Sequence, residues 1–260
     1  NTRSFELLES KSIPRASQIL IDGAYSFVLD TTEKVSFVWE EGRWQEQRDS
    51  SHFRNMDQYG PVTRLYQKKV TIVCGTDATS EQVQMYQLSA VYFANELMKQ
   101  HRLEVSILSD IQYLDLSESE QTNVFLLGGP QSNKATKMIM KDNPVPVAFD
   151  NGEVSVAGCK ISCHKQAAAM FLAPHGDHLA FVVSASSSGM FQSVSNILPL
   201  HAPYDSFPDF VLIDEEHTWK GANAIISTGY WDADWKFNPF SAFHQCPTYF
   251  HNDSECSTLW

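Results

Sequence analysis

The sequence predicts an α/β fold: a mostly parallel sheet with flanking helices, in a flavodoxin-like three-layer sandwich, preceded by a small β-rich amino-terminal segment. Three observations lead to this prediction. From residue 68 onward, continuous apolar runs of strand length alternate with amphipathic stretches of helix length. These runs end in glycine-containing turns, which is typical of strands buried on both faces. Before residue 67, short runs and turn signals alternate instead.

The first part of the chain is predicted to form short strands. Asp22-Gly23 is a hairpin-type turn, and Gly60-Pro61 ends a polar, irregular stretch. We therefore divide the chain into a β-rich segment, residues 1–66, and an α/β domain with an aromatic carboxy-terminal tail, residues 67–260. The strands expected in the first segment are Ser17–Asp22, Tyr25–Asp30 and Lys34–Trp39.

The next part alternates strand and helix. Val70–Cys74 is a continuous apolar run, and Thr79 with Gln82 three residues later forms a capping box. The helix that follows has an apolar stripe at spacings of three and four residues, made of Val83, Tyr86, Ala90, Phe93 and Leu97. Further elements are expected at Leu103–Leu108, Asn123–Leu127 and, as a helix, Lys134–Met140. This βαβ order implies parallel strands.

Beyond residue 143 the pattern indicates hairpins. Asn151-Gly152 is a strong hairpin turn between two apolar runs. The remaining elements expected are strands at Val145–Asp150, Glu153–Ile161, Ala169–Leu172, His178–Val183 and Asp209–Ile213, and a helix at Gly189–Leu198. The tail from Trp219 onward is rich in aromatic residues.

Charge and hydropathy narrow the classes of partner. The chain has 31 Asp and Glu against 19 Lys and Arg, a formal net charge of −12. This surplus repels phosphate backbones and anionic lipid, so we expect no nucleic acid and no membrane as partner. No apolar run approaches the ~20 residues that span a bilayer. A protein partner, either an upstream domain or further copies of this chain, fits better.

Three features favour a secreted, extracellular protein. The chain begins at Asn1 without an apolar signal-peptide core, as a processed product does. Cys246 and Cys256 close a short loop, and both are expected in disulfide bonds, with the pairing among the five cysteines left open. Asn252-Asp253-Ser254 in that loop is a glycosylation acceptor pattern, so we expect a glycan on Asn252.

A set of short segments, taken in chain order, carries a resemblance to a known class of proteins. They are Asp22-Gly23, Phe37–Trp39, Gly42–Trp44, Gly60-Pro61, Val70–Thr76, Leu126–Asn133, Phe181–Ser186, Pro208–Ile213, Trp219–Ala222 and Gly229–Trp235. Over residues 15–237 the chain resembles the carboxy-terminal region of secreted esterase-like proteins of the prolyl-oligopeptidase class. The resemblance implies that an α/β-hydrolase domain precedes this segment. The last two dozen residues have no counterpart in it.

A serine-hydrolase site is one candidate. Ser184–Gly189 is a serine-rich stretch between a predicted strand and a predicted helix, but it lacks the leading glycine of a nucleophile elbow. The candidate catalytic residues are Ser186 and Ser188, with His175 or His217 as the base and Asp214 as a further partner. The alternative is that the serines cap the following helix. We expect this alternative, and no catalytic site.

An anion or ligand site at the carboxyl ends of the strands is the second candidate. Glycines at a strand end let a ligand approach the backbone. The residues expected there are Gly128, Gly129, Gln131, Ser132, Asn133, Thr76 and Asp77. The spacing matches neither a dinucleotide fingerprint nor a P-loop, so no cofactor is expected. The alternative is that these are ordinary turn glycines beside a vestigial crevice.

A metal site is not expected. Cys159 and Cys163 lie four residues apart in a predicted strand, which separates them by about 13 Å, too far to chelate one ion. A disulfide or a buried thiol is the better interpretation. His175-Gly176-Asp177-His178 also places ligand residue types close together, but structural zinc typically needs a second ligand pair elsewhere in the chain. Cys74 is expected to be an inert thiol in the core.

The sequence therefore predicts a non-catalytic accessory or interaction domain of a secreted hydrolase-type protein, acting as part of it or as a processed fragment. Two alternatives stay open. One is a serine esterase or peptidase with its site near Ser186–Ser188. The other is an extracellular structural or matrix protein that assembles through its aromatic tail. That tail either forms an interface or packs back over the sheet.

Overall fold

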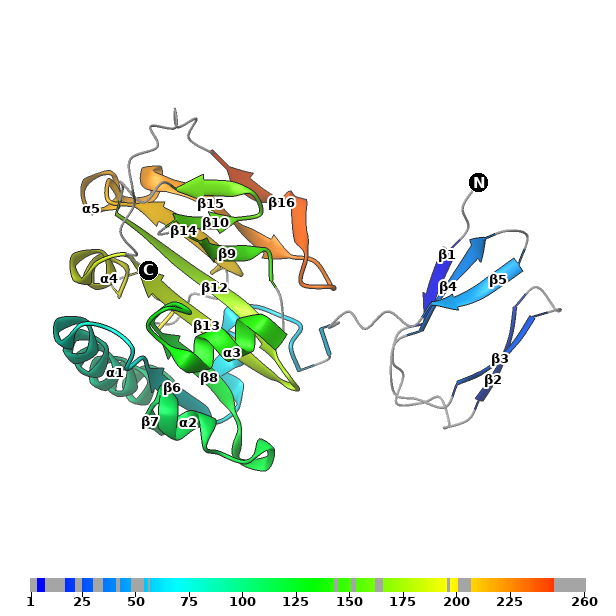
Figure 1. Cartoon of the computed structure of the whole chain (residues 1–260), viewed down its shortest axis with the longest axis horizontal. Coiled ribbons are helices and arrows are strands. Elements are labelled where there is room, and N and C mark those ends of the chain that lie inside the picture. The colour runs from blue at the N-terminus through cyan, green and yellow to red at the C-terminus, as the bar shows by residue number, and fades with distance from the viewer. Residues whose placement is uncertain are drawn as a thin grey trace. The chain divides into compact units, whose positions relative to one another are not determined.

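A computed structural model describes residues 4–7, 17–21, 25–29, 35–40, 43–47, 54–55, 57–142, 145–150, 153–161, 166–195, 197–200 and 207–245. Contacts divide the chain into two compact units, Asn1–Phe53 and Arg54–Trp260. Each unit is considered separately below, and Figure 1 names their elements.

The first unit contains two small antiparallel sheets. β1 (Ser4–Leu7), β4 (Val35–Glu40) and β5 (Arg43–Gln47) form one sheet, in the order β1-β4-β5. β2 (Ser17–Ile21) and β3 (Tyr25–Leu29) form a hairpin. The β-rich character predicted for this segment is confirmed, because each expected run forms a strand.

The second unit begins at Arg54, thirteen residues before residue 67, where the sequence places its start. The Arg54 guanidinium forms a buried ion pair with Asp209 and lies 4.2 Å from the ring centroid of Trp235. The side-chain amide of Gln58 donates to the carbonyl oxygens at both ends of the β12–β13 turn. The short helix η1 (Val62–Gln67) follows. Side-chain contacts of Arg54 and Gln58 therefore attach this segment to the second unit, although its composition resembles that of the first part of the chain.

An eight-stranded sheet forms the centre of the second unit, in the order β16-β15-β14-β12-β13-β8-β6-β7. Its strands are β6 (Val70–Cys74), β7 (Val105–Ser109), β8 (Asn123–Leu127), β12 (Ala167–His175), β13 (His178–Ala185), β14 (Phe210–Asp214), β15 (Ile225–Trp231) and β16 (Phe237–His244). Figure 1 shows them crossing the unit between its helices.

The prediction of a mostly parallel, flavodoxin-like sheet is wrong, because the sheet is mixed. β7, β6, β8 and β13 run parallel, as the βαβ pattern requires. The four pairings from β13 through β12, β14 and β15 to β16 are antiparallel. The reason lies in the connections. β12 and β13 are joined by the two-residue turn Gly176-Asp177, and β15 and β16 by five residues, whereas a parallel connection needs a dozen or more.

A small antiparallel sheet is inserted between α3 and β12. It consists of β9 (Val147–Asp150), β10 (Glu153–Val156) and β11 (Cys159–Ile161), in the order β11-β10-β9. The hairpin predicted around residues 151–152 is confirmed by the pairing of β9 with β10. The run predicted as one strand over residues 153–161 is split in two, because Ala157 and Gly158 both have positive φ and turn the chain.

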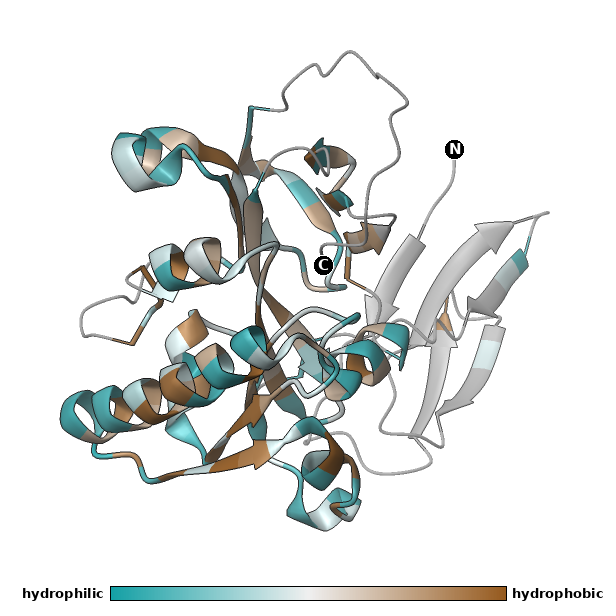
Figure 2. Cartoon of the chain, turned by 60° about the vertical axis from the view of Figure 1, so that its left-hand side comes forward, coloured by the Kyte–Doolittle hydropathy of each residue, from teal (hydrophilic) through white to brown (hydrophobic). Residues whose placement is uncertain are grey.

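Two groups of helices pack on the main sheet. α1 (Ser80–His101) contacts β6, β7 and α4 (Ser188–Ser195), whereas α2 (Asp110–Leu114) contacts β6, β7 and α3 (Lys134–Asp142). The capping box predicted for Thr79 and Gln82 is present at the start of α1. Short helices α5 (His217–Lys220), η2 (Glu118–Glu120) and η3 (Gly221–Ala224) lie in connections. Figure 2 shows hydrophobic and hydrophilic residues interspersed along α1.

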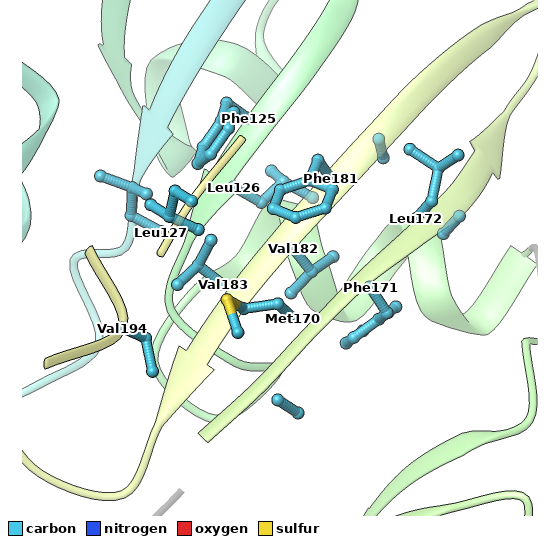
Figure 3. Close-up of a cluster of buried hydrophobic side chains, with 14 of the residues drawn as sticks. Phe125, Leu126, Leu127, Met170, Phe171, Leu172, Phe181, Val182, Val183 and Val194 are labelled. Atoms are coloured by element: carbon cyan, nitrogen blue, oxygen red, sulfur yellow. The ribbon is translucent and has the colours of Figure 1, made fainter. Parts of the chain in front are cut away.

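The core lies at the centre of the sheet, where β8, β12 and β13 are buried along nearly their whole length. Figure 3 shows side chains of these strands packed with one another and with α4. The ring centroids of Phe125 and Phe181 are 5.1 Å apart, and those of Phe93 and Phe125 are 5.6 Å apart. Each fully buried side chain of this size contributes ~1.5–3 kcal/mol.

The aromatic tail is divided between core and surface. Trp231 and Trp235 are buried, and Trp231 stacks on Phe210 with centroids 4.2 Å apart. These residues belong to β15, to the main sheet and to the loop that follows β15, so this part of the tail packs on the domain. Between residues 219 and 245, which the structure describes, the exposed aromatic residues are Trp219, Tyr230, Phe240 and Phe243.

Candidate functional site

A cleft lies at the carboxyl edge of the four parallel strands. From β6 the chain moves to one neighbour, β7, through α1, and then returns across β6 to its other neighbour, β8. The strand order therefore reverses between β6 and β8, and in α/β sheets ligands bind at such a switch point, outside the carboxyl ends of the strands. This is where sequence considerations placed the ligand site.

The cleft has a volume of about 820 Å³. Most of its lining residues are polar, and these are either uncharged or acidic. Amide and hydroxyl side chains predominate in it, Asp77 and Glu81 are its charged residues, and none of its lining residues is Lys or Arg. Such a lining suits an uncharged hydrogen-bonding group better than a phosphate. The lining residues are Asp77, Ala78, Thr79, Glu81, Gln82, Gln131, Ser132, Gln166, Ser186, Ser187, Ser188 and Gly189.

The serine-rich loop on one side of the cleft is held by structural hydrogen bonds. The Ser186 hydroxyl accepts from the backbone N–H of Ala167 at 2.9 Å, and the Ser186 N–H donates to the Ala167 carbonyl at 2.9 Å. The Ser187 hydroxyl donates to Gln166 Oε1 at 2.7 Å and accepts from the Met190 N–H. Ser186 thus extends the β12–β13 pairing, and Ser187 caps α4, as the alternative to a catalytic site requires.

His175 lies at the other end of the sheet from these serines. Ala167, the neighbour of Ser186, begins β12, and His175 ends it. Eight steps of an extended strand separate the two ends by roughly 26 Å. There His175 Nε2 is 2.7 Å from the Tyr113 hydroxyl. Burial, and secondarily the charge of His178, lower the pKa of His175 to about 4. The structure therefore does not bring this candidate base to a serine.

His217 lies at the same edge as the cleft but is bonded within its own segment. Asp214, at the end of β14, pairs with the first residue of β12, and His217 follows three residues later. His217 Nδ1 is 2.9 Å from the carbonyl oxygen of Gly221. Ser188 begins α4 and faces the cleft. In the part of the chain that the structure describes, no hydrogen bond joins His217 to the serine loop.

The glycine loop, residues 128–133 after β8, packs closely against the loop after β6 and against β13. A Cβ atom on Gly75 would lie 2.3 Å from the carbonyl oxygen of Ser132, and one on Gly129 would lie 2.4 Å from the Ser184 hydroxyl. Gly128 has φ +110°, a backbone conformation that favours glycine. The three glycines allow the loops after β6 and β8 to approach each other and β13. The glycines therefore serve close packing of these loops, which agrees with the alternative that they are ordinary turn glycines and not part of a ligand site.

A carboxylate of the chain itself occupies the start of α3. Asp110, fully buried as the first residue of α2, accepts from the Lys134 N–H at 2.7 Å and from the Thr76 hydroxyl at 2.7 Å. This is the position that an anion would take at a helix amino terminus. Asn133, also fully buried, bonds with its side chain to backbone groups of β6, β8 and α3. Thr76 and Asn133 therefore have structural roles.

Among the predicted ligand residues, Asp77, Gln131 and Ser132 line the cleft. Sequence reasoning missed Gln82, Gln166 and Asp110. Gln82 had a signal, since its capping box places it at the first turn of a helix that begins at the cleft. Gln166 and Asp110 had no such signal in the sequence, because their contacts are distant along the chain. Gln166 contacts residues that follow β13 and β14, and Asp110 contacts α3 and the loop after β6.

Three other predictions concern cysteine, metal and glycan chemistry. Cys74 is a free, buried thiol, which confirms the prediction, and burial followed by the charge of Asp110 raises its pKa to about 11. In the described residues, no three His, Cys, Asp or Glu side chains are grouped so as to hold a metal ion. Cys246, Cys256 and Asn252 lie outside the described residues.

Comparison with protein-family models and with curated proteins gives no match to this chain. None of the helices in the described residues combines the length and the hydropathy needed to cross a membrane.

Proposed function

We propose that this chain is a non-catalytic accessory or interaction domain of a secreted hydrolase-type protein. The observation that carries the proposal is the hydrogen bonding of the serine loop, residues 184–189. Ser186 continues a strand pairing, Ser187 caps a helix, and the candidate base His175 lies roughly 26 Å away along β12. The resemblance of residues 15–237 to the region that follows an α/β-hydrolase domain supplies the context.

The cleft at the carboxyl edge is the contact site in this proposal. Gln131 offers both a donor and an acceptor there. The side-chain oxygens of Gln82 and Gln166 already accept from Thr79 and Ser187, so these two residues offer mainly their amide N–H groups, and the serine hydroxyls add more. Asp77 and Glu81 disfavour anions. A backbone or side-chain amide of a protein partner matches this set of groups better than a phosphate or a carboxylate does.

The test is the intact mass of the full chain before and after treatment with a serine-reactive fluorophosphonate. We expect no added mass, and the same slow hydrolysis of an activated ester in the wild type and in a Ser186→Ala, Ser187→Ala, Ser188→Ala variant. A stoichiometric adduct that the triple variant loses would overturn the proposal and favour the esterase alternative.

The same spectra test the extracellular setting. A secreted chain should carry a glycan on Asn252 and should gain mass at cysteines upon alkylation only after reduction. A chain passed through a secretory pathway that stays unglycosylated and fully reduced would contradict the secreted assignment and leave the serine result unaffected.

A further inference from the structure

The outer edge of the main sheet at β7 lacks the features that usually prevent strands from pairing across an edge. β7 has the sequence Val-Ser-Ile-Leu-Ser, without charge or proline, and it pairs in register with β6 along its whole length. Proteins blunt such edges with charges, prolines or bulges. The opposite edge follows that rule, because β16 contains Pro239 and its pairing with β15 is bulged after Gly229.

The helices around β7 also present an uncharged surface. From residue 82 to residue 98 of α1, Glu96 is the single charged residue, and it is 7% exposed. α1 and α2 both pack on β7. Seven apolar side chains of these three elements are 36–66% exposed: Leu88, Val91, Tyr92, Met98, Ile107, Ile111 and Leu114. Figure 1 shows α1 and α2 beside β7 at this end of the sheet.

We propose that β7 pairs with β7 of a second copy of this chain, antiparallel and centred on Ile107, to form a two-fold symmetric dimer with a continuous sheet. In such an isologous interface a surface meets itself. The pairing sets Ile107 opposite Ile107, Val105 opposite Ser109 and Ser106 opposite Leu108. These pairs are uncharged. One step further along, Glu104 comes opposite Asp110, whose buried carboxylate accepts from the Thr76 hydroxyl and the Lys134 N–H.

The geometry of the helices fits this arrangement. Neighbouring strands lie ~4.8 Å apart, and α1 packs on both β6 and β7. Its axis is therefore about one strand spacing from the two-fold axis, and the two α1 helices lie about 10 Å apart, within the usual range for packed helices. The seven exposed side chains amount to on the order of 600 Å², the upper limit for an apolar patch on a typical monomer. Strand backbone and neutral glutamines bring this close to the ~800 Å² per partner of a standard interface.

Charge restricts where a second copy of the chain can dock. Each copy has a net charge of −12, so two copies can approach closely only where the surface is uncharged. β7 itself and residues 82–95 of α1 meet this condition, and Glu104, directly before β7, is an exposed charge beside them. The inference is independent of the proposed function, because it uses neither the cleft nor the serine loop.

The test is sedimentation equilibrium of the full chain and of two charge variants at the axis, Ile107→Lys and Ile107→Glu. We expect a dimer for the wild type. Each variant alone should dissociate, with a dissociation constant raised roughly a hundredfold or more, because like charges then face each other. An equimolar mixture of the two variants should restore a dimer, since the introduced lysine of one copy and the introduced glutamate of the other would pair across the axis.

Phe243→Lys, on the opposite edge strand and with a side chain also about half exposed, is the matched control and should remain dimeric. If an Ile107 variant does not fold, as judged by circular dichroism, Val91→Lys on α1, closer than Leu88 to the side of the helix, makes the same prediction. A monomeric wild type would overturn the proposal. So would a dimer that survives both Ile107 substitutions, or one that only Phe243→Lys dissociates.

Discussion

At the scale of single residues, Asp110 prevents the glycine loop from binding an anion at the start of α3. Its carboxylate lies where a bound anion would contact the start of α3, and the Thr76 hydroxyl and the Lys134 N–H already donate to it. A second negative charge there would face an unscreened carboxylate in a buried site. The predicted anion site is thus occupied by the protein, and ligand contacts are left to side chains that line the cleft.

His175 makes the stability of the fold depend on pH. Its pKa is lowered to about 4 from the ordinary value of 6.5, so between these values the unfolded chain binds a proton that the folded protein excludes. Stability should therefore fall as the pH is lowered from 6.5 toward 4, by roughly 3 kcal/mol in all. We expect His175→Gln to remove most of this slope in urea unfolding measured at successive pH values.

His217→Gln serves as the control for this prediction, because His217 is only partly buried and bonds within its own segment. It should keep the wild-type slope. If His175→Gln loses stability on acidification as steeply as the wild type, the buried imidazole is not the cause.

At the scale of elements, two glycines near the cleft differ in what surrounds them. Gly75 directly follows β6 and lies against the backbone of Ser132, whereas Gly189 lies in the first turn of α4 with nothing within 4 Å of an added Cβ. Neither has a positive φ. Their substitution by alanine therefore separates close packing from chain flexibility.

We expect Gly75→Ala to lower the free energy of unfolding by about 1–3 kcal/mol, because the loop after β8 must move to admit the methyl group. Gly189→Ala should be neutral or stabilising by up to about 1 kcal/mol, because alanine favours the helix. Urea unfolding of both variants measures this. Equal effects of the two substitutions would contradict the packing role of Gly75.

At the scale of the whole molecule, the segment 54–66 determines where the second unit begins. Arg54 pairs with Asp209, and Asn123 donates through its side-chain amide to the Leu65 carbonyl. We expect a chain of residues 54–260 to melt at the same temperature as the second unit of the full chain. A chain of residues 67–260 should be less stable by more than roughly 3–5 kcal/mol, since buried Asp209 would lose its ion-pair partner and the core would also lose the side chains of Val62 and Leu65.

Differential scanning calorimetry of the two shortened chains measures this, with Arg54→Ala in the full chain as the matched variant. The substitution should reproduce a large part of the loss. If residues 67–260 are as stable as residues 54–260, the boundary lies at residue 66, where composition alone places it.

Much of the local structure could be predicted from the sequence. The strand at residues 70–74, the capping box of Thr79 and the hairpin around residues 151–152 each depend on neighbours within a few residues. The candidate site was predicted less completely. Its edge of the sheet was predicted, because parallel strands bring their carboxyl ends together, but Gln166 was not, because its role depends on Ser187 of the neighbouring strand.

The sequence by itself therefore determined which stretches become strands and helices, since periodicity, caps and turn residues act over short distances along the chain. Only the tertiary structure decided the strand directions in half of the sheet. There β12 pairs antiparallel with β14, which is 35 or more residues away in the sequence. It also decided that Asp110 occupies the predicted anion position and that His175 lies away from the serines. These outcomes depend on pairings between distant segments, which no local pattern specifies.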